Sequence, residues 1–243
     1  MGRMGEVTEG AGRRAPARPL RRGVQLMAGL VLYAASIAAL VHAGLGNMPW
    51  DVLSQGLSHR LGWSFGTVTI VLSVLVLGCW IPLRQRPGVG TVLNVLVIGL
   101  LVDPFLALLG RLGTPPLGVA VALTAAGIVL NGLATALYIG TRLGPGPRDG
   151  LMTGLVSRTG WSVRLVRSGI EVVVVAVGWV LGGTVGLGTL AYAVGIGPLV
   201  HVLLPRFTVP LERTTTGAGA GTDGPGGDRT GEHVAERRAV EAG

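Results

Sequence analysis

Hydrophobic residues gather in six long runs along the chain, and stretches rich in glycine, proline and arginine separate them. The runs cover about residues 23–43, 65–83, 90–110, 117–140, 163–181 and 186–204. Each run is close to the roughly 20 apolar residues that an α-helix needs to cross a bilayer. The pattern therefore predicts six transmembrane helices.

The first run follows an arginine-rich segment, which is also the pattern of a secretory signal peptide. Two features favour a permanent helix instead. The run from Gly23 to about Ala43 is longer than an ordinary signal core, and it aligns with the internal run 121–141, which cannot be a signal. We therefore expect residues 23–43 to form the first transmembrane helix.

A repeated sequence extends across these runs. The stretch Gly44–Ser64 recurs without gaps as Arg142–Ser162, at an offset of 98 residues. Between residues 45 and 99, twenty of the fifty-five aligned positions are identical. The glycine-rich stretch that begins at Gly88 keeps the same register, because it aligns with the stretch that begins at Gly186. The chain is therefore a duplicated unit, and the repeat decides its architecture.

Each copy of the repeat contains three predicted helices, in residues 23–110 and 121–208, with residues 111–120 as a linker. Because three is odd, the second copy enters the membrane from the side opposite to the first. The sequence therefore predicts an all-α membrane protein with about six transmembrane helices in two inverted three-helix repeats. The polar segments 1–22 and 209–243 lie outside the repeats, and we expect both to be disordered.

Proline falls inside two of the predicted helices. The third contains Asp103-Pro104, and the sixth contains Pro198. Proline removes one helix hydrogen bond and clashes with the preceding turn. We therefore expect the third helix to be broken at Asp103-Pro104.

The composition agrees with this membrane architecture. Hydrophobic residues make up 49% of the 243, charged residues make up only 13%, and the mean hydropathy is +0.60. A soluble domain of this size would carry more charge on its surface. All 20 basic residues are arginines that flank apolar runs, so the high pI indicates anchors at the membrane surface rather than nucleic-acid binding.

The placement of arginine predicts the orientation. With the N-terminus inside, Arg60 and Arg111 fall on the outer side, and the other arginines between residues 3 and 206 fall on the inner side. The positive-inside rule then places both termini in the cytoplasm. We expect a multi-pass protein of a cytoplasmic (inner) membrane.

Two proline motifs stand at equivalent positions in the two copies, and each precedes a short segment of about nine residues. An aspartate in the first turn of a helix can cap free N–H groups and face the positive end of the helix dipole. The alternative is that both segments are re-entrant helices that line a central path, where the carboxylates favour a cation or a proton. The candidate residues of these motifs are Pro49, Asp51, Pro147, Arg148 and Asp149.

Three further polar residues lie inside the apolar runs. Glu171 follows Arg167 by one helical turn, so the two predict either a buried ion pair or part of a proton or substrate relay. Asp103 and His201 occupy equivalent repeat positions; Asp103 would cap a resumed helix, and His201 would be a hydrogen-bonded core residue or a titrating group. Asn94 and Asn131 are expected to join helices by hydrogen bonds.

The sequence offers no metal-dependent motif of soluble-type catalysis. It contains no H-E-x-x-H and no Cys/His metal cluster, and its one cysteine is Cys79. We therefore predict no enzyme activity, no cofactor and no metal. An intramembrane enzyme that uses Asp and Glu is the weakest of the alternatives.

Several motifs make the chain resemble the YczE/YitT group of bacterial multi-pass membrane proteins over residues 23–205. They are Gly46-x-x-Pro49-Trp50-Asp51, Gly144-Pro145-Gly146-Pro147-Arg148-Asp149-Gly150-Leu151-Met152 and Gly182-Gly183-x-x-Gly186-x-Gly188-Thr189. The resemblance implies a helical protein of the bacterial cytoplasmic membrane, and it implies no substrate or catalytic residue. Asn47-Met48 stands where the second copy has Pro145-Gly146, so the two halves need not be equivalent.

The expected function is a transporter or channel for a small solute or ion, because an inverted repeat with paired broken-helix motifs is typical of transporters. The alternative is a non-transporting membrane factor that binds or organises a cytoplasmic partner through its arginine-rich face. Beyond the lipid bilayer, both a homo-oligomer and a cytoplasmic partner stay open, and nucleic acid is not expected.

Overall fold

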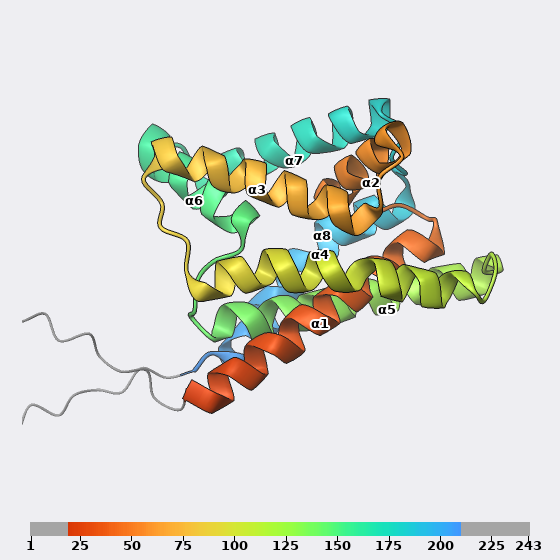
Figure 1. Cartoon of the computed structure of the whole chain (residues 1–243), viewed down its shortest axis with the longest axis horizontal. Coiled ribbons are helices and arrows are strands. Elements are labelled where there is room, and N and C mark those ends of the chain that lie inside the picture. The colour runs from red at the N-terminus through yellow and green to blue at the C-terminus, as the bar shows by residue number, and fades with distance from the viewer. Residues whose placement is uncertain (1–18, 210–243) are drawn as a thin grey trace, which may run out of the picture. The chain divides into compact units, whose positions relative to one another are not determined.

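The computed structural model describes residues 19–209, and all the regular structure in this part of the chain is helical (Figure 1). Four helices belong to the first copy of the repeat and four to the second, in the same order of lengths. They are α1 (Pro19–Ala43), α2 (Pro49–Leu61), α3 (Phe65–Leu83), α4 (Val89–Gly110), α5 (Leu117–Gly140), α6 (Pro147–Thr159), α7 (Val163–Val180) and α8 (Leu187–Phe207).

The short helices α2 and α6 begin and end at the repeated residues. Pro49 and Pro147 occupy the first helical positions, where proline loses no intrahelical bond. Each helix stops at a glycine with positive φ, 68° at Gly62 and 71° at Gly160, which a residue with a Cβ adopts only with strain. The repeated Gly-Trp-Ser motif is therefore a helix stop.

The same motif also starts the next helix. The hydroxyl of Ser64 accepts a hydrogen bond from the N–H of Thr67 at 3.2 Å, and this caps α3. The hydroxyl of Ser162 accepts from the N–H of Leu165 at 3.3 Å and caps α7 in the same way. One tripeptide thus ends a short helix and begins a long one in each half.

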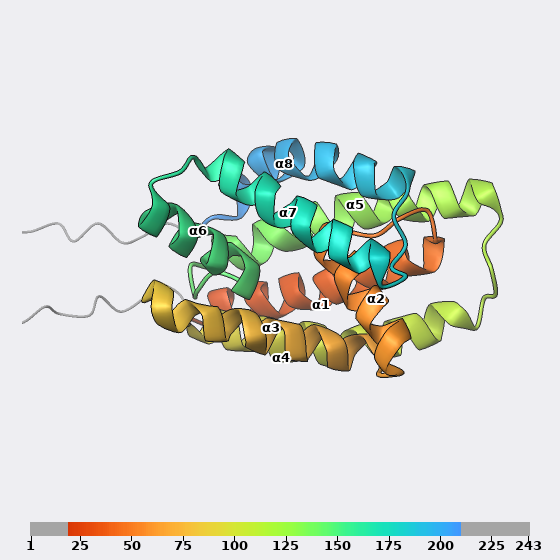
Figure 2. The same cartoon turned by 90° about the horizontal axis from the view of Figure 1, so that it is seen from above.

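The helices pack in a pattern that the two copies share (Figures 1 and 2). α1 packs against α4 and α5, and α5 packs against α8; on the other side of the molecule α2 packs against α7, and α3 against α6. Exchanging each helix for its counterpart in the other copy converts the α1–α4 contact into α5–α8, and α2–α7 into α6–α3. The contact between α3 and α4 lacks a comparable counterpart between α7 and α8.

The halves are joined where the loop before each short helix meets a helix start of the other half. The N–H of Gly90 donates to the carbonyl of Leu143 at 2.9 Å, and the N–H of Gly188 donates to Leu45 at 2.8 Å. A Cβ at Gly88 would lie 2.4 Å from the Leu143 oxygen. The repeated Gly-x-Gly-Thr motif thus allows the close approach of the two halves.

The predicted break at Asp103-Pro104 is wrong, because α4 runs without interruption from Val89 to Gly110. Asp103 does not cap a resumed helix. Its carboxylate accepts a hydrogen bond from the N–H of Gly66 at 2.9 Å, at the first turn of α3. Proline removes only one intrahelical bond, and a long membrane-type helix held by its neighbours tolerates that loss.

Five helices between residues 19 and 209 are long and apolar enough to cross a membrane: α1, α3, α4, α5 and α8. The remaining predicted span, α7, which corresponds to the fifth apolar run, carries Arg164, Arg167 and Glu171 within its 18 residues. Composition alone therefore does not qualify α7 as a membrane-spanning helix.

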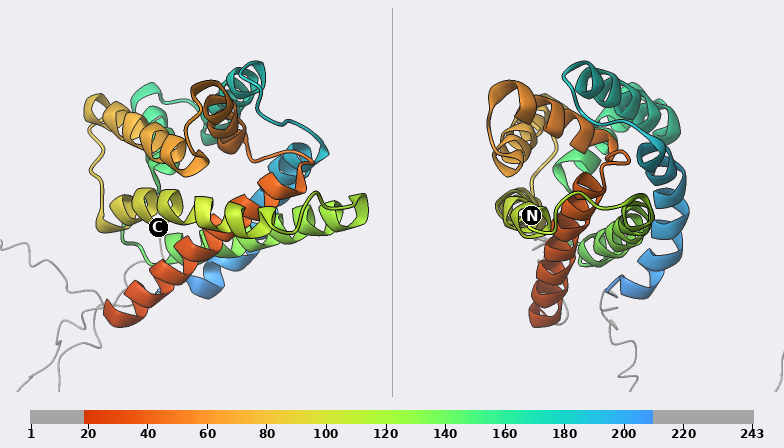
Figure 3. Two further views of the ribbon diagram at one scale, coloured as in Figure 1. Left: turned by 45° about the vertical axis from the view of Figure 1, so that its right-hand side comes forward. Right: turned by 90° about the vertical axis from the view of Figure 1, so that its right-hand side faces the viewer.

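The two ends of the described chain lie at the same end of the helix bundle (Figures 1 and 3). The amide of Gln25, near the start of α1, donates to the carbonyl of Phe207 at the end of α8 at 2.7 Å. Helix α1 begins at Pro19 rather than at Gly23, and Arg22, which was expected in a disordered tail, is buried and donates from Nε to the carbonyl of Thr141 at 2.7 Å. The remainder of both predicted tails lies outside the described residues.

Candidate functional site

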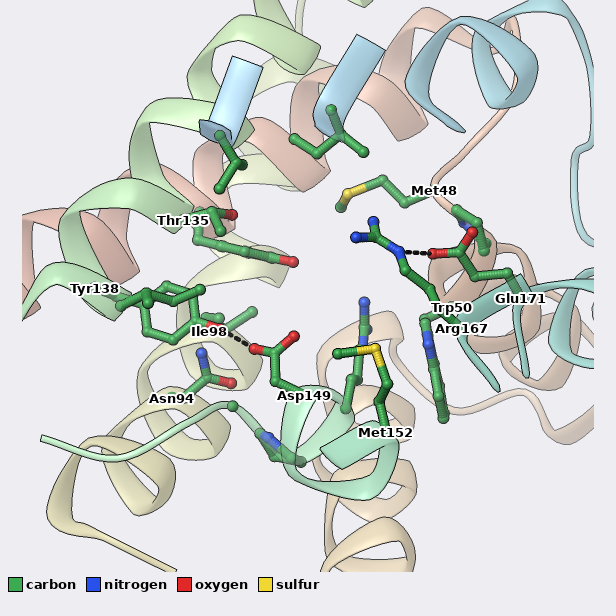
Figure 4. A pocket seen from close by; sticks show the side chains of 18 of the residues that line it. Met48, Trp50, Asn94, Ile98, Thr135, Tyr138, Asp149, Met152, Arg167 and Glu171 are labelled. Atoms are coloured by element: carbon green, nitrogen blue, oxygen red, sulfur yellow. Dashed lines mark hydrogen bonds and ion pairs between the residues drawn. The ribbon is translucent and has the colours of Figure 1, made fainter. Parts of the chain in front are cut away.

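A cavity of about 330 Å³ lies at the centre of the described helices, and every one of the eight contributes to its wall (Figure 4). Much of the wall is apolar, including Met48, Ile98, Met152 and Ile196. Four charged side chains interrupt it: Arg148, Asp149, Arg167 and Glu171. An apolar pocket with a few convergent polar groups is the usual form of a ligand site.

The first turns of the two short helices meet at this cavity. Pro49 and Pro147 both line it, and an Nη2 of Arg148 in α6 donates to Oδ1 of Asp51 in α2 at 3.1 Å. The rest of α2 and the rest of α6 extend toward opposite ends of the bundle (Figures 1 and 2). The equivalent motifs of the two halves are thus in direct contact, although they are 97 residues apart in the sequence.

Asp51 lies behind the cavity wall and is only 1% exposed. Its Oδ1 is held by Arg148, whereas its Oδ2 is buried with no hydrogen-bond partner among the described residues. Burial raises the pKa of the Asp51 carboxyl above its ordinary value, and the charge and hydrogen bond of Arg148 oppose this rise. The same guanidinium lies 5.3 Å from the ring centroid of Trp50, at a distance typical of a cation–π contact.

Asp149 lines the cavity and is held differently from its counterpart Asp51. Its Oδ2 accepts a hydrogen bond from the hydroxyl of Tyr138 in α5 (Figure 4). Tyr138 in turn packs edge to face against Tyr33 of α1, with ring centroids 6.2 Å apart. The carboxylate is therefore positioned from outside its own helix.

The capping interpretation of the two aspartates is wrong as far as hydrogen bonds are concerned. Neither α2 nor α6 has a side-chain bond at its N-cap, and the partners of Asp51 and Asp149 belong to other helices. The aspartates bond to other helices instead of capping their own, because Arg148 offers a charged donor and Tyr138 offers a directed hydroxyl. Both carboxylates still lie in a first turn, where the helix dipole favours negative charge.

The predicted pairing of Arg167 with Glu171 is confirmed, with Nε and Oε1 2.9 Å apart. The expected burial of this pair is wrong, since the two side chains are 47% and 29% exposed. Both residues line the cavity, and Figure 4 places them across the open space from Asp149.

Asp103 and His201, the other two predicted site residues, do not line the cavity. Asp103 contacts the first turn of α3 instead. His201 is exposed on α8, so the expectation of a core histidine is wrong. Their equivalent positions in the repeat do not bring them to the site, because α4 reaches the cavity through Asn94 and Ile98, and α8 reaches it through Tyr192, Ile196, Gly197 and Val200.

Sequence reasoning missed the aromatic part of the wall, which consists of Tyr33, Trp50, Tyr138 and Tyr192. A signal was present: at the repeat offset of 98, Tyr33 aligns with Asn131, and Asn94 aligns with Tyr192. Polar positions that recur inside apolar runs mark the helix faces that turn inward.

The two asparagines differ in role. Asn131 is buried and joins three helices as predicted, because its Nδ2 donates to Ser36 at 2.8 Å and its Oδ1 accepts from Tyr192 at 2.9 Å. Asn94 lines the cavity instead. Among residues 19–209, no group of three or more His, Cys, Asp or Glu side chains is arranged to hold a metal ion.

Comparison with known proteins gives the chain a family. Residues 20–205 match the "Family of unknown function (DUF6198)". An uncharacterized protein of Haemophilus influenzae is 40% identical over 182 residues, which is 72% of this chain and 82% of the relative. The "Uncharacterized membrane protein YczE" of Bacillus subtilis is 33% identical over 181 residues, 74% of this chain and 83% of the relative.

A third relative is the "Uncharacterized protein YyaS" of Bacillus subtilis, 26% identical over 179 residues, which is 73% of this chain and 89% of the relative. No solved structure matches the chain. The chain therefore belongs to the DUF6198 family, and the expected resemblance to the YczE-like bacterial membrane proteins is confirmed.

Proposed function

We propose that this membrane protein moves a small solute across the bacterial cytoplasmic membrane through the central cavity. The observation that carries the proposal is the meeting of two half-length helices, one from each copy of the repeat, at a cavity lined by all eight helices. Discontinuous helices whose ends meet at a central site are a recurring construction of secondary transporters.

The proposal includes six membrane crossings in two inverted repeats, formed by α7 together with α1, α3, α4, α5 and α8. The charges of α7 do not argue against a span, because Arg167 and Glu171 pair with each other and line the cavity. Intramembrane charges are tolerated when they are paired and face a polar interior. The equivalent packing of the two copies, and the opposite directions of α2 and α6, support the inverted relation.

Both termini are proposed to be cytoplasmic. The start of α1 and the end of α8 lie together, as an even number of crossings requires. Arg84, Arg142 and Arg158 belong to loops or helix ends on that side of the proposed topology, whereas Arg60 and Arg111 belong to the other. This asymmetry follows the positive-inside rule.

A cycle of transport requires access to the cavity from each side in turn. The loop before α2 is bonded to the start of α8, and the loop before α6 is bonded to the start of α4. These two equivalent junctions lie at opposite ends of the bundle (Figure 1), so opening one while the other stays closed would expose the cavity to one side only. The Asp51–Arg148 ion pair holds the two short helices together between the openings.

The test is a flux screen with the purified full-length protein in liposomes, using panels of cationic, anionic, zwitterionic and neutral solutes. We expect flux of one class, and we expect Asp149→Asn to reduce it while the protein stays folded. Asp103→Asn is the matched control, because it changes the same kind of carboxylate outside the cavity and keeps an acceptor for Gly66. No flux of any class, together with a stoichiometric soluble partner that co-purifies, would instead favour a non-transporting membrane factor.

A further inference from the structure

The charges around the cavity do not balance. Arg148 is paired with Asp51 at 3.1 Å, and Arg167 is paired with Glu171 at 2.9 Å. Asp149 is left with no basic side chain at ion-pair distance among the described residues, and its carboxylate accepts a hydrogen bond from the neutral hydroxyl of Tyr138. The two arginines and three carboxylates therefore leave one negative charge, and it lies on the cavity wall.

The wall beside Asp149 is suited to a positively charged ligand in a second respect. Tyr33, Tyr138 and Tyr192 all line the cavity, and the faces of aromatic rings attract cations. Trp50 is the exception, because the guanidinium of Arg148 already lies over its ring. Both arginines are paired with carboxylates, so their charges in this wall are matched, and Asp149 is the charged lining residue without an opposite charge at ion-pair distance among the described residues.

The geometry points to Asp149 as the binding group for a small organic cation, an amine or a quaternary ammonium ion with an otherwise apolar body. The inference names the class of solute that the cavity would bind. It rests on the proposed function only for the transport of that solute after binding. In Figure 4 the carboxylate of Asp149 stands between Tyr138 and Met152, at the edge of the open space, with one oxygen bonded to Tyr138. The remaining oxygen would face the positive group of the ligand.

The affinity is expected to be modest. Asp149 lies in the first turn of α6, and the partial positive charge of that helix end offsets part of the carboxylate charge. The apolar residues Met152, Ile170 and Ile196 supply contact for the body of the ligand. A volume of about 330 Å³ restricts the site to small molecules.

The test compares five probes of nearly equal size in a thermal-shift assay on the full-length protein in detergent. 3,3-Dimethylbutylamine and choline are cations, 3,3-dimethylbutan-1-ol is neutral, 3,3-dimethylbutanoate is an anion, and betaine is a zwitterion. We expect stabilisation by one or both cations and clearly weaker effects of the other three. A response to the amine alone assigns a primary ammonium ligand, and a response to choline assigns a quaternary one.

Two variants assign the effect to Asp149. Asp149→Asn keeps an acceptor for Tyr138 but removes the charge, and the loss of a charged hydrogen bond is expected to lower cation affinity by about tenfold to a hundredfold. Asp103→Asn should leave that affinity unchanged. Tyr138→Phe keeps the ring and frees the carboxylate, so cation affinity should be maintained or increase, and this variant serves if Asp149→Asn does not fold.

The outcomes separate this inference from the proposed transport. Equal or greater stabilisation by the anion, the alcohol or betaine overturns it, as does a lack of response to both cations. A cation preference that survives in Asp149→Asn, or that falls in Tyr138→Phe as much as in Asp149→Asn, also overturns it. Cation binding without flux in liposomes would support the site and reject transport. Flux of an anion would support transport and overturn the cation site.

Discussion

Two ion pairs lie at the cavity, and their burial predicts different contributions to stability. Asp51 is 1% exposed, so Arg148→Gln would leave a buried carboxylate without its charge partner. We expect this change to lower the free energy of unfolding by about 3–5 kcal/mol. The double change with Asp51→Asn should recover most of the loss, because both charges are then absent. Denaturant unfolding of the detergent-purified variants would measure the coupling.

The pair of Arg167 and Glu171 is the control for this double-mutant cycle. Its side chains are 47% and 29% exposed and one helical turn apart. A partly exposed pair at this spacing contributes only about 0.3–0.5 kcal/mol. Coupling energies of similar size in the two cycles would contradict the difference in burial described for the two sites.

The sequence could predict one of these pairs and not the other. Arg167 and Glu171 are four residues apart on a helix, and that spacing alone brings the side chains together. Asp51 and Arg148 are 97 residues apart, and no local rule relates them. The repeat showed that their motifs were equivalent, but equivalent positions meet only if the halves pack around a common centre. The position of Asp149 at the cavity could be proposed, whereas its bond to Tyr138 depends on how α5 packs.

At the scale of elements, local chemistry predicted most of the helices. Proline at the first position and glycine at the end delimit α2 and α6, and apolar length predicts the long helices. The errors came from tertiary context. Pro104 was expected to break α4, but one lost hydrogen bond does not disrupt a long packed helix. The span predicted for α7 stays a prediction, because three of its residues are charged and apolar composition alone does not qualify it.

The contact between α2 and α7 depends on glycine. A Cβ at Gly178 would lie 2.5 Å from the backbone nitrogen of Leu53, and neither backbone can move freely. We therefore expect Gly178→Ala to destabilise the protein by about 1–3 kcal/mol through overpacking. Gly169→Ala in the same helix is the control, because nothing lies within 4 Å of its added Cβ.

Thermal unfolding of these two variants would check the expectation. The Gly169 variant should keep the stability of the unchanged protein, or gain slightly from the better helix propensity of alanine. Equal stability of both variants would mean that α2 and α7 do not approach as closely as described.

At the scale of the whole molecule, the described residues that line the cavity fall between Tyr33 and Val200, and the family match ends at residue 205. The last described hydrogen bond joins Val209 to the carbonyl of Gly140 at 3.0 Å. Deletion of residues 212–243 is therefore expected to leave membrane insertion and folding unchanged. Fractionation of membranes and size-exclusion chromatography would measure this, and loss of the inserted protein on truncation would argue against the prediction.

The number of crossings decides whether the two repeats are inverted, and it can be measured from the positions of the termini. Six crossings, with α7 as a span, put both termini on the same side, whereas the five helices that qualify by composition alone would put them on opposite sides. Gly5→Cys, Ala235→Cys and Thr114→Cys would each be made in a Cys79→Ser background, because the native cysteine is exposed.

In intact cells, an impermeant thiol reagent should label Thr114→Cys, which lies in the exposed turn between α4 and α5. Gly5→Cys and Ala235→Cys should react only after permeabilisation, because arginine is concentrated on their side of the proposed topology. Labelling of one terminus but not the other would mean an odd number of crossings. The two copies would then lack the inverted relation, and α2 and α6 could not approach the cavity from opposite faces of the membrane. Labelling of both termini in intact cells would keep the inverted repeats and reverse the orientation.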